Sequence, residues 1–128
     1  MRTVLIPALL PFLLATALAA PAHADNYPVS GRWGENRSGD PDKGAIDCAG
    51  RRVVGFNGNQ RTDSKGGVPA YRNVTVQPSG EGYRIVDEFT TGQISNARTT
   101  FTLRKADADR IEMRLQPSGA VLKLQRCR

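Results

Sequence analysis

Few side chains in this sequence could do catalytic chemistry. The chain has 128 residues and a single histidine, His23, which lies in a segment that we expect to be removed on export. Without an imidazole, the mature protein lacks Ser-His-Asp and Cys-His arrangements and the common zinc sites. No glycine-rich phosphate loop or serine-nucleophile motif occurs either. We therefore expect that the protein is not an enzyme and binds no cofactor.

Carboxylates are the remaining candidates for chemistry. Asp87 and Glu88 are adjacent in a predicted strand, so their side chains point to opposite faces and cannot flank one substrate together. Asp87 shares the parity of Tyr83 and Ile85 and is expected to point inward. An inward aspartate could anchor a ligand, but pairing with an interior arginine is the interpretation that we favour.

Other aspartates gather in turns and raise the question of calcium. Asp40, Asp42 and Asp47 lie in one stretch, and Asp107 and Asp109 lie in another. The spacing and the final glutamate of an EF-hand are missing, and aspartate is common in ordinary turns. We expect no metal site.

The first 24 residues have the pattern of a secretory signal peptide. Arg2 precedes an apolar run over residues 4–20, and Ala22-His23-Ala24 matches an A-x-A cleavage site. The run contains two prolines and is short for a membrane span, so we expect no stable membrane insertion. Residues 1–24 are therefore predicted to be cleaved after Ala24. Residues 25–128 would form a single periplasmic or secreted domain, which we expect to be a monomer.

The formal net charge of +6 comes mainly from arginines spread along the chain. An aromatic residue lies beside an arginine at Arg32-Trp33, Tyr71-Arg72 and Tyr83-Arg84, a combination that can bind single-stranded nucleic acid. Neighbours on a strand face opposite sides, so we expect the aromatic ring inside and the arginine in solvent. Export also removes most nucleic acid, and we expect no nucleic-acid partner. In a cell envelope such a surface would rather contact lipid headgroups, peptidoglycan or polyanions weakly, and we favour solvated faces with no partner.

Apolar residues alternate with polar ones from Tyr71 to the end of the chain, and no segment shows a sustained helical pattern. The predicted strands cover residues 29–34, 46–48, 52–56, 71–77, 83–89, 97–104, 110–116 and 121–126. The sequence Gln-Pro-Ser-Gly occurs at 77–80 and at 116–119 and predicts type I turns, while residues 105–109 close a further hairpin. This pattern predicts an all-β, antiparallel up-and-down meander. A barrel or a sandwich would fit it, and we favour a barrel of about eight strands because closure removes exposed edges.

Cys48 and Cys127 form an even pair in a chain predicted to enter an oxidising compartment, which favours a disulfide. A domain with so modest a core needs such a crosslink. Free redox-active thiols are disfavoured because no C-x-x-C spacing occurs. Cys127 has the opposite parity to the inward Leu122 and Leu124. A bulge near Gln125 or a bridge on the outside of the barrel would accommodate it.

Gly31-Arg32-Trp33 resembles the G-x-W signature that opens lipocalin-like (calycin) barrels. The resemblance implies that Trp33 plugs the closed end of a barrel and that a late arginine, best matched by Arg126, packs across it. The chain is also similar to bacterial periplasmic inhibitors of secreted metalloproteases, which have a signal peptide, a G-x-W strand, a compact eight-stranded barrel and one disulfide. The free N-terminal segment and short bridge of those inhibitors do not carry over to this chain.

We expect a binding protein that takes a small apolar or amphiphilic ligand at the barrel mouth. The predicted ligand-binding residues are Trp33, Tyr71, Tyr83, Asp87 and Phe101. The alternative is a protein-protein role, as a protease inhibitor or a cell-envelope partner, in which the polar loops 35–44 and 57–70 carry the contact.

Overall fold

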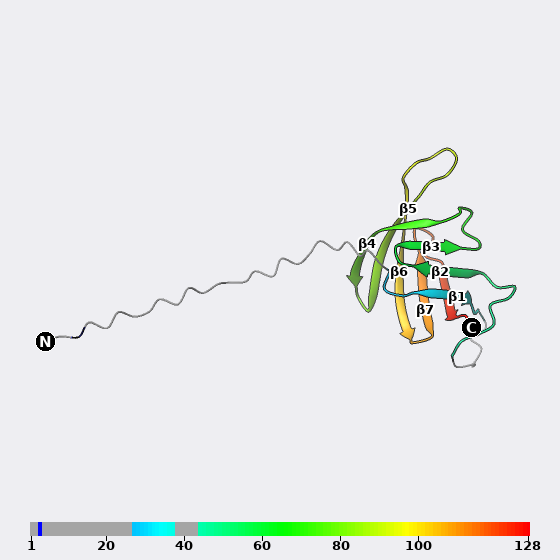
Figure 1. Cartoon of the computed structure of the whole chain (residues 1–128), viewed down its shortest axis with the longest axis horizontal. Helices are drawn as coiled ribbons and strands as arrows, with labels where there is room; N and C mark the ends of the chain where they lie inside the picture. Colours follow the sequence, from blue (N-terminus) through cyan, green and yellow to red (C-terminus); the bar gives the residue numbers. More distant parts are fainter. Residues whose placement is uncertain (1–2, 4–26, 38–43) are drawn as a thin grey trace.

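The computed structural model describes residues 27–37 and 44–128, together with Thr3. These residues form a closed antiparallel barrel (Figure 1). Its strands are β1 (Gly31–Glu35), β2 (Val53–Asn57), β3 (Gln60–Asp63), β4 (Tyr71–Ser79), β5 (Gly82–Phe89), β6 (Ala97–Asp107), β7 (Arg110–Leu115) and β8 (Val121–Arg126). Each strand pairs with the next along the chain, and β8 returns to pair with β1. The predicted all-β meander and its closure into a barrel are confirmed.

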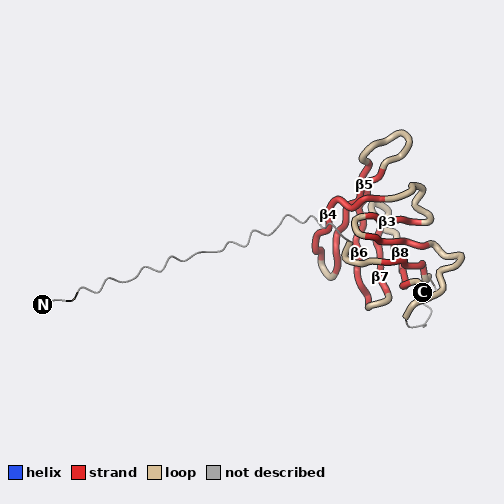
Figure 2. The backbone as a smooth tube through the Cα atoms, in the orientation of Figure 1, coloured by secondary structure: helices blue, strands red, loops and turns tan. Residues whose placement is uncertain are grey.

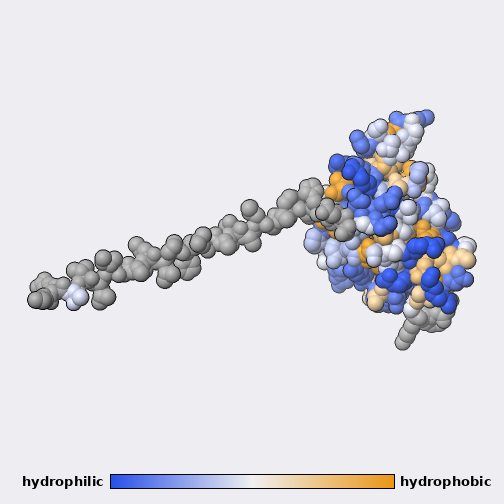
Figure 3. Space-filling model, in the orientation of Figure 1, coloured by the Kyte–Doolittle hydropathy of each residue, from blue (hydrophilic) through white to orange (hydrophobic). Residues whose placement is uncertain are grey.

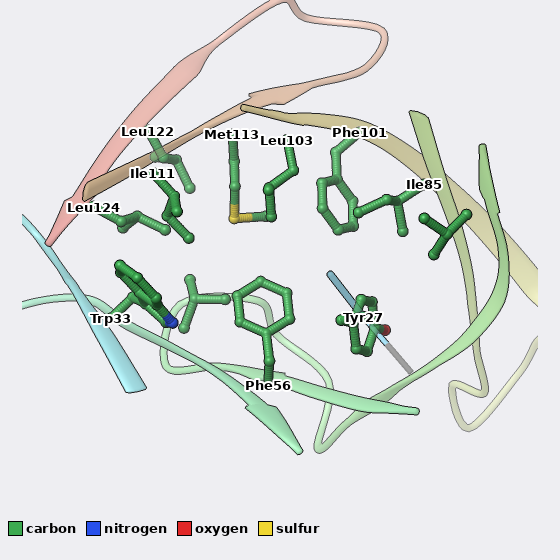
Figure 4. Close-up of a cluster of buried hydrophobic side chains, with 12 residues drawn as sticks. Tyr27, Trp33, Phe56, Ile85, Phe101, Leu103, Ile111, Met113, Leu122 and Leu124 are labelled. Atoms are coloured by element: carbon green, nitrogen blue, oxygen red, sulfur yellow. The ribbon is translucent and has the colours of Figure 1, made fainter. Parts of the chain in front are cut away.

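The period-two pattern fixes which side chains fill the barrel. In β6, Phe101 and Leu103 are buried, while the intervening Thr102 and the following Arg104 lie toward solvent. The inward residues of all the longer strands meet along the barrel axis as one apolar cluster (Figure 4). Its most deeply buried members are Trp33, Val54, Ile85, Phe101, Leu103, Ile111 and Met113. Burial of these large side chains is the main source of stability.

Two predicted segments are wrong. Residues 46–48 are not a strand, because only Ile46 forms an isolated bridge, to Cys127. The predicted loop 57–70 contains β3, which pairs with β2 across a tight turn in which Asn57 opposes Gln60. Gly58 in that turn has a φ of 61°, a conformation that glycine adopts readily. Asn57-Gly58 after an apolar run is a common hairpin signal, and it explains why β3 begins there.

The two Gln-Pro-Ser-Gly segments differ from the predicted type I turns. Pro78 lies inside β4 and pairs with Tyr83, so the β4–β5 turn consists of Gly80 and Glu81. The second segment does connect β7 to β8, but its Gln116–Pro117 peptide is cis, which a type I turn does not contain. The predicted hairpin at 105–109 is present as the β6–β7 connection, with a register shift between Lys105 and Asp107.

The predicted disulfide joins Cys48 to Cys127 and lies on the outside of the barrel. Trp33 points inward, so the next residue, Gly34, faces outward, and a Cβ placed there would clash with the Cys48 sulfur. The parity of Cys127 is thus accommodated by an outward-facing bridge. Beside it, Gln125 is buried on the outer face, where it accepts a hydrogen bond from Asn36 and donates one to the Gly44 carbonyl.

No helix in the described part of the chain is long and apolar enough to cross a membrane. The predicted signal peptide, apart from Thr3, falls outside the described residues. Polar and charged side chains cover most of the face in Figure 3, with apolar side chains visible only in small patches.

Replacing both cysteines with alanine should lower the free energy of unfolding by about 2–5 kcal/mol, because the bridge closes a long loop.

Gly34→Ala should lower the free energy of unfolding of the oxidised protein, and this loss should be smaller in the Cys48→Ala/Cys127→Ala background. Urea unfolding followed by Trp33 fluorescence measures the free energy lost in the cysteine variant and in Gly34→Ala. Gly92→Ala, where an added Cβ would meet no atom within 4 Å, is the matched control. Equal costs of Gly34→Ala in the two backgrounds would show that the sulfur does not occupy the space above Gly34.

Candidate functional site

The two ends of the barrel are built differently (Figure 2). Tight turns between β2 and β3, β4 and β5, and β6 and β7 gather at the end where β1 begins and β8 finishes. Residues 27–30, here called the N-terminal strap, lead into β1 at that end. Its first backbone N–H, from Tyr27, donates to the Gly58 carbonyl at 3.1 Å. The longer connections, such as the one between β5 and β6, lie at the opposite end.

Trp33 and Arg126 meet at the strap end. Their positions are paired across the β1–β8 closure, and the Arg126 guanidinium carbon lies 4.4 Å from the centre of the Trp33 ring. The indole N–H donates to the Ser30 carbonyl in the strap at 3.0 Å. Arg126 donates to the Ala108 carbonyl at 3.1 Å and to the Asp109 carboxylate at 3.3 Å. The tryptophan-arginine contact that the calycin resemblance implied is therefore present, and both partners are held by further hydrogen bonds.

A cavity of about 550 Å³ opens at this end, between the strap and the β6–β7 turn. Trp33, Ile111 and Val29 give it an apolar side, while Lys105 and Arg126 bring positive charge. Its remaining lining residues are Tyr27, Pro28, Ser30, Gly58, Asp107 and Ala108. The volume falls within the range of about 300–1,000 Å³ that is usual for small-molecule sites. The mixed lining suits a molecule with an apolar part and a polar part.

Three of the predicted site residues meet elsewhere, around Arg61. The Arg61 guanidinium carbon lies 3.9 Å from the centre of the Tyr71 ring and 4.7 Å from that of Phe101. Its Nε donates to the Asp87 carboxylate at 2.7 Å, and Asp87 also accepts from the Asn73 amide at 3.2 Å. The favoured prediction that Asp87 pairs with an interior arginine is confirmed. Arg61 and Asp87 are 4% and 0% exposed, so they act on each other rather than on solvent.

Sequence reasoning missed both Arg61 and Tyr27 as interior residues. The predicted loop 57–70 contains Arg61, although the Asn57-Gly58 turn signal indicates a strand that begins just before it. Tyr27 of the strap enters the barrel beside Phe56, with the ring centres 5.0 Å apart (Figure 4). Burial raises the pKa of Tyr27 far above its usual range, and the nearby Asp87 carboxylate raises it further, while Arg61 partly opposes both. Tyr27 thus stays neutral and ties the strap to the core.

The other predicted residues are spread over the barrel. Tyr83 is half-buried and lines a separate pocket of about 220 Å³ with Thr102 and Arg114. Among residues 27–37 and 44–128, no three His, Cys, Asp or Glu side chains gather as a metal site would require. Asp40 and Asp42, and most of the predicted contact loop 35–44, lie outside the described residues. The five predicted residues therefore do not form one site, and only Trp33 lines the strap-end cavity.

A second ion pair lies toward the opposite end. Arg52 donates to both carboxylate oxygens of Asp63, at 2.9 and 2.6 Å. Burial alone would raise the pKa of Asp63, but the hydrogen bonds from Arg52 and from the Lys65 backbone N–H outweigh it and hold the pKa below its usual range. This pair joins the residue that precedes β2 to the last residue of β3, and it stabilises the shortest strand of the barrel.

Comparison with known proteins gives no match for this chain among family models, curated proteins or solved structures.

Arg61→Met should lower the free energy of unfolding by about 3–5 kcal/mol, because it leaves the Asp87 carboxylate buried and unpaired. The double variant Arg61→Met/Asp87→Leu should recover most of that loss. Urea unfolding of the three proteins tests this, with Arg104→Met, at an exposed ion pair, as a control that should change little. A double variant no more stable than Arg61→Met would contradict a dominant role for the unpaired charge.

The lowered pKa of Asp63 predicts a loss of stability in acid. The folded protein keeps this carboxylate ionised at a pH where the unfolded chain, with an ordinary pKa of about 3.9, takes up a proton. Its contribution is therefore present above about pH 4 and is lost as the pH falls toward the folded-state pKa. The free energy of unfolding of Asp63→Asn should fall less between neutral pH and about pH 3 than that of the parent protein. The exposed Glu81→Gln should behave as the parent does, and equal slopes for parent and Asp63→Asn would refute the prediction.

Proposed function

We propose that this protein is an exported, non-enzymatic binding protein that holds a small amphiphilic molecule in the strap-end cavity. The observation that carries the proposal is the cavity itself, with the Trp33 ring and Ile111 on one side and charged groups on the other. The site sits at the barrel end where β1 begins, between the strap and the β6–β7 turn. The expected class of ligand, apolar or amphiphilic, is thus kept. Its proposed binding site is the strap-end cavity, which only Trp33 of the five predicted residues lines.

The rest of the barrel leaves less room for a ligand. Phe101 is 1% exposed and packs within the core, and Arg61 is enclosed by Tyr71, Phe101 and Asp87. Large side chains fill the axis of the barrel (Figure 4). A ligand at those residues would have to displace packed groups, which costs several kcal/mol by the usual measure of core disruption. The strap-end cavity is already open between the strap and the β6–β7 turn, and Trp33 and Ile111, each 1% exposed, form its inner wall.

Export is supported by the disulfide between Cys48 and Cys127, which is compatible with an oxidising compartment such as the periplasm or the extracellular space. A binding role also agrees with the sequence. Its only histidine, His23, lies in the predicted signal peptide, so the mature protein would have no histidine for acid–base catalysis. The residues around the cavity offer apolar contact, hydrogen bonds and charge, which are the means by which a small molecule is recognised.

Trp33 is the only tryptophan of the chain, so its fluorescence reports directly on the cavity. Three amphiphiles with the same apolar chain serve as probes: octanoate, octyl glucoside and octyltrimethylammonium, each below its micelle-forming concentration. At least one should change the Trp33 emission saturably, because a molecule bound in the cavity changes the polarity of the surroundings of the ring.

Ala108→Phe, which fills the cavity from the β6–β7 turn, should abolish the response. Ala106→Phe adds the same bulk at an exposed neighbouring position that does not line the cavity, and it should leave the response intact. If none of the three probes changes the emission, or if Ala108→Phe responds as Ala106→Phe does, the proposed site is wrong.

A further inference from the structure

We infer that the ligand of the strap-end cavity carries an anionic head group, bound by Lys105 and assisted by Arg126, with its apolar part on Trp33 and Ile111. This inference rests on the proposed function, since it names the chemical class of molecule that the same cavity takes. It depends on the balance of charges around the cavity, on the strand parity that Lys105 shares with Phe101 and Leu103, and on the hydrogen bonds that hold the Arg126 side chain.

The positive side chains at the strap-end cavity outnumber the carboxylates that could neutralise them. Asp109 is paired with Arg126 at 3.3 Å, and Asp107 approaches Arg110 at 3.9 Å. Each carboxylate of the β6–β7 turn thus already has an arginine. Lys105 has no carboxylate within ion-pair distance among the residues that the structure describes. Its ammonium group is therefore the uncompensated charge of the cavity, and an anion there would meet a net positive potential.

The strand register directs Lys105 toward the cavity. Phe101 and Leu103 are buried inward residues of β6, and Lys105 is the next position of the same parity. It pairs with Ile111 of β7, which is 1% exposed. The register shift that follows Lys105 bends the end of this hairpin, as bulges commonly do. A lysine at the last inward position of a strand places its charge where the apolar interior gives way to solvent.

Arg126 supplies a second donor that is held in place before any ligand arrives. Its Nε and Nη2 donate to Asp109 and to the Ala108 carbonyl, and its guanidinium carbon lies 4.4 Å from the centre of the Trp33 ring. The remaining nitrogen, Nη1, makes no hydrogen bond to the described residues and lies on the side of Gly31. A fixed guanidinium loses little entropy on binding, so its free N–H groups suit a carboxylate, sulfate or phosphate oxygen.

The three octyl probes separate this inference from the proposed function. Octanoate should bind about tenfold more tightly than octyl glucoside, and octyltrimethylammonium should bind most weakly, because charge-assisted hydrogen bonds are worth about twice neutral ones. Lys105→Gln should weaken octanoate about tenfold and leave octyl glucoside unchanged. Lys123→Gln, which removes an exposed lysine of β8 that does not line the cavity, is the matched control and should leave both affinities unchanged.

Added salt should weaken octanoate binding to the parent protein more than binding to Lys105→Gln. If all three probes bind with equal affinity, or if Lys105→Gln affects octanoate no more than Lys123→Gln does, the anionic head group is refuted while the cavity stands as a binding site. If no probe binds, both the inference and the proposed function fail.

Discussion

Closure of the sheet between β1 and β8 is the constraint on which the rest of this structure depends. It brings Trp33 of the first strand beside Arg126 of the last, and it places Cys127 where Cys48 can bridge to it over Gly34. Different interactions therefore stabilise the β1–β8 pairing on the inside and on the outside of the barrel. Inside, an aromatic ring packs against a guanidinium, and outside, a covalent bond crosses a residue that must lack a side chain. Trp33 and Arg126, on the inner face of this β1–β8 pairing, line the cavity at the strap end.

The interior divides into an apolar part and a charged part. Strands β5 to β8 contribute mainly aliphatic and aromatic side chains, whereas the short strand β3 contributes Arg61. Arg61 is stabilised by Asp87 and by two aromatic rings, which together replace the water that it loses. Tyr27 of the strap packs edge-on against Phe56 in the core and is close enough to Asp87 to feel the charge of its carboxylate. The N-terminal strap is therefore part of the core, and it forms one wall of the cavity at the same time.

Much of the fold could be predicted from the sequence because the longer strands alternate clearly. Phe101 and Leu103, with Thr102 between them, indicate a half-buried strand without reference to any neighbour. β3 was missed because its inward residues are charged, so that Arg61 and Asp63 break the apolar pattern that marks a buried face. The strap-end cavity is harder to predict from the sequence than the strands are. Trp33, Lys105 and Arg126 are far apart in the chain, and only closure of the barrel brings them to one end. The position of the strap depends on contacts of Tyr27 that no local pattern encodes.

The most direct test of this account is a nuclear magnetic resonance titration of the protein with octanoate, followed at side-chain positions. We expect saturable shifts of the Trp33 indole N–H, the Ile111 methyl groups and the Lys105 methylene that bears the ammonium group, because all three residues line the strap-end cavity. Signals of Tyr71 and Phe101, which enclose Arg61 elsewhere in the barrel, should stay in place. Shifts centred on Tyr71 and Phe101, or no saturable shift at Trp33, would contradict the claim that this protein binds its ligand at the strap end.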